Sequence, residues 1–280
     1  MAVSPTPFPE FAPEPRREML SVSVWPCAQA DSKAQRKGRY LPEYMAHPGK
    51  MLPAIAEHAI THYTQPGDLV VDPMAGIGTT LVEAVHADRM ALGVEYEPRW
   101  ADLARRNVEH ATDRGAPGYA VVVQGDARDI VRLVGSDTVG KAALVLTSPP
   151  YEDSLHRHVR CGHGSSLTHR NPDESFIRFR EILEGCYLLL KPGGHLAMTS
   201  RPKQCGGKFC DLPSRAWQSA IDAGFELLGR YVALLSEVRD DDLVNAADVP
   251  AHLPRHEEVH ILTKPANSEV VAQRVTRIAA

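Results

Sequence analysis

The chain of 280 residues is 43% apolar, which is enough to bury one hydrophobic core. Its formal net charge is −4 at pH 7, which excludes a uniformly basic nucleic-acid-binding protein and leaves only local basic patches for such a role. No apolar stretch approaches the roughly 18 residues that span a bilayer, and no signal peptide opens the sequence, so we expect a soluble, cytoplasmic protein without membrane contact.

The chain contains an odd number of cysteines and is large enough to fold without disulfides. They are Cys27, Cys161, Cys186, Cys205 and Cys210. We therefore expect reduced thiols. Cys161-x-His163 and Cys205-x4-Cys210 could form a zinc site only if the fold brought the two pairs together, so we predict no metal.

The two ends of the chain are predicted as tails around one domain. Residues 1–20 contain five prolines among scattered charges, and residues 266–280 have no clear apolar face. We expect the domain to cover residues 21–265, without internal repeats.

Strand and helix patterns alternate along this domain. Strands are predicted at residues 68–72, 90–94, 120–124, 143–147, 195–199, 231–235 and 258–263. Helices are predicted between them at residues 79–86, 98–110 and 174–190. This order indicates an α/β fold with a doubly wound, Rossmann-like sheet of seven strands. The apolar–polar alternation of the last strand indicates that it runs antiparallel.

A turn with two glycines follows the first predicted strand. It reads Asp72-Pro-Met-Ala-Gly-Ile-Gly-Thr-Thr80 and leads into a helix. Gly76 and Gly78 let the backbone approach a ligand closely, and the helix N-terminus offers unpaired N–H groups. Leu81 stands where a dinucleotide fingerprint needs a third glycine, so a pyrophosphate is not the expected ligand.

Two acidic residues close the next two strands. Glu95 could accept hydrogen bonds from both hydroxyls of a ribose, and Asp126 could accept one from an adenine amino group. The alternative is that the turn only joins strand to helix and that both carboxylates are helix N-caps. Carboxylates and turn glycines at three successive strand ends favour the ligand site.

The fourth predicted strand ends in Thr147-Ser-Pro-Pro-Tyr151. In a doubly wound sheet the first and fourth strands flank the switch point, so this segment should face the glycine turn. Two successive prolines fix the backbone and remove two N–H donors, which leaves oxygen acceptors suited to an amine. The alternative is a rigid turn without a chemical role.

Together the two motifs resemble the amino-methyltransferases that form N4-methylcytosine or N6-methyladenine in DNA. The resemblance implies a class I AdoMet-dependent methyltransferase sheet, with AdoMet held by the first motif and a flipped base held by the second. It also implies that Ser148, aided by the Pro149 carbonyl, accepts a hydrogen bond from the target amine, and that Tyr151 stacks on the base.

A third segment, His47-Pro-Gly-Lys-Met-Leu-Pro53, resembles the part of these enzymes that packs over the methionine end of AdoMet. His47 or Lys50 could therefore contact the cofactor, while Pro53 also suits the start of a helix. The predicted catalytic residues are Ser148, Pro149, Pro150 and Tyr151. The predicted cofactor-binding residues are His47, Lys50, Asp72, Pro73, Met74, Ala75, Gly76, Gly78, Thr79, Thr80, Glu95, Tyr96, Asp126 and Ala127.

Nucleic acid is expected to contact basic segments near the catalytic turn. Recognition loops are predicted near residues 152–173 and 201–215, and a further basic cluster covers residues 36–40. The predicted nucleic-acid-binding residues are Arg36, Lys37, Arg39, Arg157, Arg160, Arg170, Arg201 and Lys203. Each cluster could equally be a solvated surface.

The resemblance predicts methyl transfer from AdoMet to an exocyclic amine of double-stranded DNA, with cytosine N4 ahead of adenine N6 because of Ser148. RNA guanine-N2 or adenine-N6 methylation stays open, since the same acceptor turn serves any such amine. Methylation of cytosine C5 by a Cys27 thiolate is disfavoured, because Cys27 precedes the glycine turn. A non-catalytic AdoMet- or DNA-binding regulator, a homodimer and a cognate restriction nuclease also stay open.

Overall fold

In the computed structural model of the protein, the described residues are 23–149, 172–205, 208–239, 242–244 and 254–266. Their strands are β1 Val24–Trp25, β2 Leu69–Asp72, β3 Met90–Glu95, β4 Tyr119–Gln124, β5 Ala142–Thr147, β6 Leu190–Ser200, β7 Lys203–Cys205, β8 Lys208–Cys210, β9 Glu226–Leu234, β10 Glu237–Arg239, β11 Asp242–Val244 and β12 His256–Thr263. Their α-helices are α1 Ser32–Arg36, α2 Pro53–Tyr63, α3 Thr79–His86, α4 Pro98–Asp113, α5 Ile130–Val134, α6 Pro172–Leu189 and α7 Leu212–Asp222. Short 3-10 helices are η1 Pro42–Ala46, η2 Ala127–Asp129 and η3 Ser136–Thr138.

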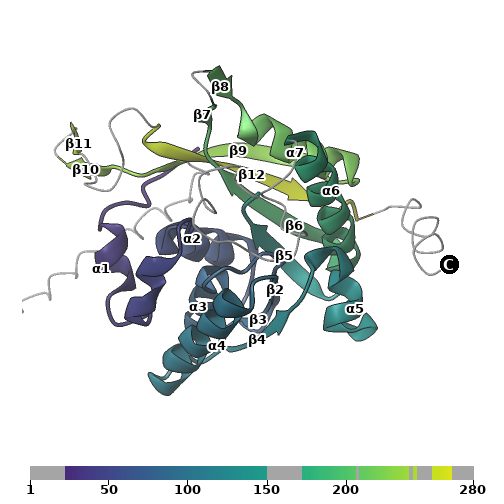
Figure 1. Ribbon diagram of the computed structural model, residues 1–280, viewed down its shortest axis with the longest axis horizontal. Helices are drawn as coiled ribbons and strands as arrows, with labels where there is room; N and C mark the ends of the chain where they lie inside the picture. The colour runs from purple at the N-terminus through teal and green to yellow at the C-terminus, as the bar shows by residue number, and fades with distance from the viewer. Residues whose placement is uncertain (1–22, 150–171, 206–207, 240–241, 245–253, 267–280) are drawn as a thin grey trace, which may run out of the picture.

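The largest sheet has eight strands in the order β1-β9-β12-β6-β5-β2-β3-β4. Helices α2, α3 and α4 cover one face, and α5, α6 and α7 cover the other (Figure 1). β12 runs antiparallel to both of its neighbours, β6 and β9. The predicted doubly wound α/β fold with a reversed last strand is therefore confirmed.

The sheet has one strand more than the seven predicted. β1 pairs in parallel with β9 at the sheet edge, with Val24 opposite Val232 and Trp25 opposite Ala233. Periodicity does not reveal such a strand, because two residues are too few to show an alternating pattern.

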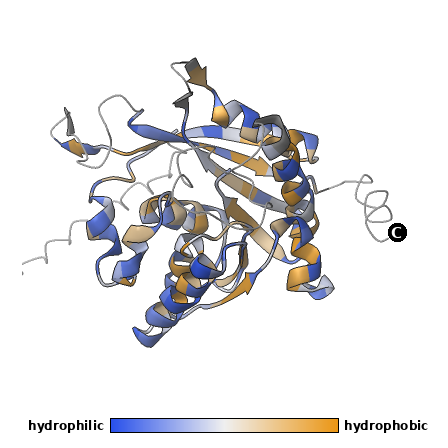
Figure 2. Cartoon of the chain, viewed as in Figure 1, coloured by the Kyte–Doolittle hydropathy of each residue, from blue (hydrophilic) through white to orange (hydrophobic). Residues whose placement is uncertain are grey.

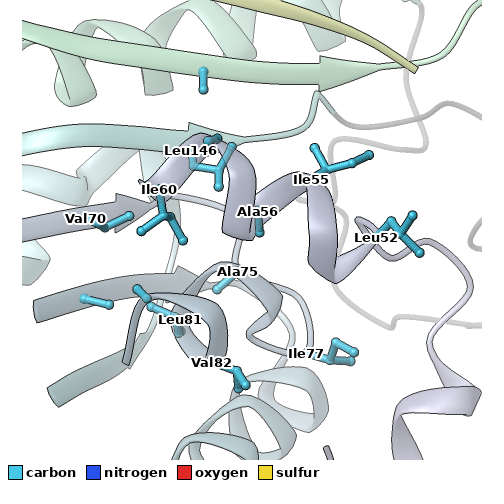
Figure 3. Close-up of a cluster of buried hydrophobic side chains, with 14 of the residues drawn as sticks. Leu52, Ile55, Ala56, Ile60, Val70, Ala75, Ile77, Leu81, Val82 and Leu146 are labelled. Carbon is cyan, nitrogen blue, oxygen red and sulfur yellow. The ribbon is translucent and has the colours of Figure 1, made fainter. Parts of the chain in front are cut away.

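Apolar side chains form one buried cluster on each face of the sheet. Figure 3 shows part of the first cluster, which includes Ile55 and Ile60 of α2, Val70 of β2 and Ala75 of the glycine turn. The central strands are apolar and the outer helix surfaces are largely hydrophilic (Figure 2). All six residues of β5 are buried, as expected for a strand covered on both faces. Among the described residues, no helix is long and apolar enough to cross a membrane.

The segment 201–215, predicted as a loop, contains regular elements. β7 and β8 form an antiparallel hairpin, and α7 follows it. Cys210 is disulfide-bonded, which contradicts the expectation that all five cysteines are reduced. Cys27 and Cys186 are buried free thiols, and burial raises the pKa of Cys27 to about 12.

Candidate cofactor and catalytic site

The glycine turn between β2 and α3 is organised around the carboxylate of Asp72. This side chain is 5% exposed, and its two oxygens accept hydrogen bonds from Thr80 Oγ1 at 2.6 Å and from the Met74 N–H at 3.0 Å. The Ala75 N–H donates to the Val94 carbonyl at 2.9 Å, which ties the turn to β3. Burial raises the pKa of Asp72 to about 6, although both hydrogen bonds act to lower it. Asp72 therefore holds the shape of the turn from inside.

Both glycines of the turn are required by their backbone conformation. Gly76 has φ +53° and Gly78 has φ +84°, a region that side chains rarely adopt. A Cβ on Gly78 would also lie 3.2 Å from the Ala104 Cβ of α4, and a Cβ on Gly76 would lie 3.4 Å from His47 Nε2. Gly78 is the N-cap of α3 and supplies no side-chain capping bond. The N-terminus of α3 is thus left without a side chain that would compete with a ligand.

Glu95 closes β3 beside this turn. Its Oε2 accepts from the Gly76 N–H at 2.7 Å, and its Oε1 accepts from the Glu97 N–H at 2.8 Å. Burial raises the pKa of Glu95 to about 7, against the lowering effect of these two bonds, and the nearby Asp72 carboxylate raises it further. The N-cap of α4 is Glu97, so the capping alternative is wrong for Glu95. Each carboxylate oxygen can accept a second hydrogen bond, as a ribose hydroxyl requires.

Asp126, at the end of the next strand, is already engaged. Its side chain caps η2 by accepting from the Arg128 N–H, and it forms an ion pair with the Arg128 guanidinium at 2.6 Å. Burial alone would raise the pKa of Asp126, but the bonds from Arg128 hold it below its usual value. The capping alternative therefore describes Asp126, and its contact with an adenine amino group stays a prediction. Ala127 is buried beside it and Tyr96 is half-buried.

Residues 36–51, here called the strap, run from α1 to the start of α2 and carry His47 and Lys50. The His47 ring packs edge-on against Trp100 of α4 with 4.5 Å between ring centroids. Lys50 Nζ donates to the His47 carbonyl at 2.7 Å, and burial followed by the charge of Arg36 lowers its pKa. The structure thus brings His47 close to Gly76 and holds Lys50 in the same segment.

The basic cluster at residues 36–40 differs from the prediction. Arg36 is 1% exposed, donates to the Met51 carbonyl and lies 5.6 Å from the Tyr40 ring centroid. Its predicted role as a phosphate contact is therefore wrong, because the guanidinium is buried. Arg39 forms an ion pair with Glu83 of α3, and Lys37 is exposed.

The predicted catalytic turn begins directly after β5. Ser148 is half-buried and Pro149 is buried, whereas Pro150 and Tyr151 lie outside the described residues. β5 pairs in parallel with β2, with Val145 opposite Val71, so Ser148 leaves the sheet at the same edge as the glycine turn.

The predicted nucleic-acid contacts beyond this turn are only partly described. Arg157, Arg160 and Arg170 lie outside the described residues, as does the side chain of Lys203. Arg201 forms an ion pair with Glu257 at 3.2 Å, so this arginine is not a free cation. Their contacts with nucleic acid stay predictions.

Three buried polar side chains near β5 were not predicted as site residues, although Thr147 opens the Thr147–Tyr151 motif. Thr147 Oγ1, Ser200 Oγ and both ring nitrogens of His260 have no hydrogen-bond partner within the described part of the chain. Met198 pairs with both Thr147 and His260, and Ser200 follows two residues later, so these side chains share one face of the sheet. Burial lowers the pKa of His260 to about 4, so its imidazole is neutral at pH 7.

Asn107 of α4 is a second residue that the motifs did not identify. Its Nδ2 donates to the Ile77 carbonyl of the glycine turn, and its Oδ1 accepts from the Leu41 N–H of the strap, both at 2.9 Å. A polar residue at a buried helix position was the available signal, because Asn107 lies on the same helix face as Trp100 and Ala104.

Comparison with known proteins relates this arrangement to methyltransferases. Residues 13–106 match the N6/N4 methyltransferase family, described as DNA methylase. The chain is 27% identical to a tRNA (guanine(10)-N2)-dimethyltransferase of Methanothermobacter thermautotrophicus, over 66% of this chain and 45% of that protein. It is 33% identical to the DNA adenine methyltransferase YhdJ of Escherichia coli, over 30% of this chain and 29% of that protein. The crystal structure of TrmN from Thermus thermophilus shares the fold with a TM-score of 0.51 and 21% identity, over 77% of this chain and 50% of that one.

These matches confirm the family resemblance and the Rossmann-like methyltransferase fold. The chain spans less than half the length of the curated relatives that it matches. The family match includes the glycine turn and Glu95, but it ends before Ser148. The family match therefore assigns no role to the Ser148 segment.

Proposed function

Because residues 13–106 belong to the N6/N4 DNA methylase family, we propose that the protein transfers a methyl group from AdoMet to an exocyclic amino group of a DNA base, with cytosine N4 as the leading target. One observation carries the proposal. The glycine turn and the Ser148–Pro149 segment follow two adjacent parallel strands, β2 and β5, and lie at the same edge of the sheet. A cofactor on the first and a base on the second would meet at the switch point of the sheet.

The residues present at the turn fit AdoMet. Gly76 and Gly78 leave room for close approach to the backbone, and Glu95 offers carboxylate oxygens for the two ribose hydroxyls. His47 and Lys50 lie on the strap, where they would cover the methionine end. The bound cofactor would supply an electrophilic methyl group on a sulfonium sulfur.

Ser148 and the Pro149 carbonyl would orient the target amine by accepting its N–H hydrogens. As the new nitrogen–carbon bond forms and the carbon–sulfur bond breaks, positive charge develops on the nitrogen, and these fixed acceptors would stabilise it. The amine then loses one proton to solvent. No covalent nucleophile is needed, so most of the acceleration would come from positioning.

DNA is the proposed partner, with the target base flipped out of the duplex to reach this edge. Lys37 is exposed and could contact phosphate, and the same role is proposed for Arg39, Arg201 and Lys203. The arginines of residues 152–173 would follow the backbone next to the catalytic turn.

RNA is the second candidate substrate. The relative from Methanothermobacter thermautotrophicus is named for methylation of a tRNA guanine N2, which is also an exocyclic amine. Ser148 in front of the two prolines favours DNA cytosine N4, while the relationship to a DNA adenine methyltransferase keeps adenine N6 as the runner-up.

The test is base-resolution sequencing of modified DNA from a methylation-free host that expresses the wild type, Ser148→Ala or Ser136→Ala. Ser136 is exposed in η3, so its replacement is the matched control. We expect N4-methylcytosine at one recurrent short site in the wild type and the control. In Ser148→Ala the modification should fall by orders of magnitude, while calorimetry still detects binding of S-adenosylhomocysteine.

Other outcomes would change the proposal in defined ways. N6-methyladenine would move the target to adenine, and unmodified DNA together with modified RNA would favour the RNA candidate. Full activity in Ser148→Ala would contradict the catalytic assignment. A wild type that binds S-adenosylhomocysteine but modifies neither nucleic acid would support the non-catalytic regulator.

A further inference from the structure

We propose that Asn107 is a positioning residue that fastens the strap to the glycine turn, so that cofactor binding and docking of the strap depend on each other. The inference rests on the proposed AdoMet site and names a residue outside the two motifs. Asn107 lies in α4 and is fully buried. It is therefore placed to act on the cofactor only through the segments that it connects.

The two hydrogen bonds of Asn107 join parts of the chain that are far apart in sequence. Its amide nitrogen donates to the Ile77 carbonyl between the two turn glycines, and its amide oxygen accepts from the Leu41 N–H of the strap. Ile77 itself is buried against the cluster that Figure 3 shows. One side chain thus fixes both the glycine turn and the strap.

The rest of the same helix face supports this connection. Trp100, one turn before Ala104, packs against His47, and Ala104 lies directly against Gly78. Residues 100, 104 and 107 follow the spacing of one face of an α-helix. This face of α4 therefore contacts the strap at one end, the turn in the middle, and both segments at Asn107.

Only an amide of this length satisfies both partners. A carboxylate at this position could still accept from the Leu41 N–H but could not donate to the Ile77 carbonyl, and an apolar side chain could do neither. Tyr40 of the strap also donates a buried hydrogen bond to Glu83 Oε1 at 2.6 Å, which ties the strap to α3 but not to the glycine turn. The Arg106–Glu43 ion pair is about half exposed on both side chains, and such pairs contribute little.

These contacts would couple binding of the cofactor at the glycine turn to docking of the strap. If Asn107 holds the strap in register with the turn, S-adenosylhomocysteine should bind more tightly to the docked strap and should in turn protect it. This reciprocity is thermodynamic, and coupling of this kind commonly changes affinity by about 5–150-fold.

The experiment compares the full chain as wild type, Asn107→Leu, Asn107→Asp and Arg106→Ala. Calorimetry gives the affinity for S-adenosylhomocysteine, and amide hydrogen exchange follows the strap with and without this ligand. In the wild type, ligand should slow exchange at Leu41 and its neighbours in the strap. In Asn107→Leu we expect affinity to fall roughly tenfold or more and the ligand to lose its effect on strap exchange. Arg106→Ala should stay within about twofold of wild type.

Asn107→Asp keeps the proposal testable if the leucine variant does not fold, because it retains the Leu41 bond and loses the Ile77 bond. It should bind the ligand more weakly than wild type. If the folded variants have a lower melting temperature but wild-type affinity and ligand-dependent strap protection, the role of Asn107 is only structural and the inference is overturned. A wild type that does not bind S-adenosylhomocysteine would instead refute the proposed function, on which this inference rests.

Discussion

The region around the glycine turn and the region around β5, β6 and β12 differ in how many of their buried polar groups form hydrogen bonds. Around the turn after β2, Asp72, Glu95 and Asn107 all form hydrogen bonds to the backbone. On β5, β6 and β12, Thr147 Oγ1, Ser200 Oγ and the His260 ring nitrogens have no such partner in the ranges that the structure describes. Buried polar groups in folded proteins are nearly always hydrogen-bonded, so these unpaired groups are exceptions to that rule.

This difference indicates that the proposed cofactor side is preorganised and the proposed base side is not. The side proposed for the cofactor is fixed by the chain's own hydrogen bonds before any ligand arrives. The side proposed for the base has buried polar groups that the described chain does not pair. Removing a polar group should therefore be costly on the first side and cheap on the second.

The largest effect is expected for Asp72→Ala. This change leaves the Thr80 hydroxyl and the Met74 N–H without their acceptor, so the affinity for S-adenosylhomocysteine should fall roughly 100-fold in calorimetry. Asp68→Ala is the matched control, because Asp68 lies just before β2 and pairs with Lys191 at 3.1 Å. Its affinity should change less than about twofold. Equal affinity in both variants would show that the turn does not hold the cofactor.

An intermediate effect is expected from the titration of Glu95. Its pKa of about 7 means that the carboxylate needed for the ribose hydroxyls is largely protonated at pH 6, so affinity should be roughly tenfold weaker at pH 6 than at pH 8. Glu95→Gln should bind weakly at both pH values and show a much smaller pH dependence, to which Asp72, with a pKa of about 6, still contributes. A wild-type profile that is equally flat would argue against an ionised Glu95 in the complex.

The same shift has a consequence for the unliganded protein. The pKa of Glu95 is raised above the unfolded value of about 4.3, so its contribution to stability is present at low pH and is lost as the pH rises through about 7. Thermal unfolding between pH 5 and pH 8 should show this loss in the wild type and a smaller one in Glu95→Gln.

The smallest effect, and the opposite sign, is expected for His260→Leu. The buried neutral imidazole has no hydrogen-bond partner within the described chain, and leucine has a similar volume, so the free energy of unfolding should stay unchanged or rise by about 1 kcal/mol. Calorimetric unfolding at pH 7.5, with Asn107→Leu as the destabilised comparison, measures the difference. A clear loss of stability in His260→Leu would reveal a partner such as buried water.

Local patterns were sufficient to predict most of the fold. The helix predicted at residues 79–86 coincides with α3, and the apolar run at 143–147 lies within β5. Both were predictable because amphipathic helices and buried strands have recognisable patterns of apolar residues. β1 was missed because its two residues are too few to show an alternating pattern. The β7–β8 hairpin was missed because each strand has only three residues.

The candidate site was predictable where its chemistry is local. The glycine turn and Glu95 follow each other at successive strand ends, and both were identified. Arg36 was misplaced because a cationic side chain is normally solvated, and nothing in the sequence shows that the Met51 carbonyl and two tyrosine rings surround it. Asn107 was missed because its partners are brought together only by the fold.

The pairing of β1 with β9 has a consequence for the order in which the chain can fold as it is made. Val24 cannot reach its place until Val232 has been synthesised, which takes about 10–40 s at common rates of translation. The strap waits as well, because Leu41 needs Asn107 of α4. The residues of β1 thus come early in the chain but find their partners late, whereas the strap can dock as soon as α4 has been made.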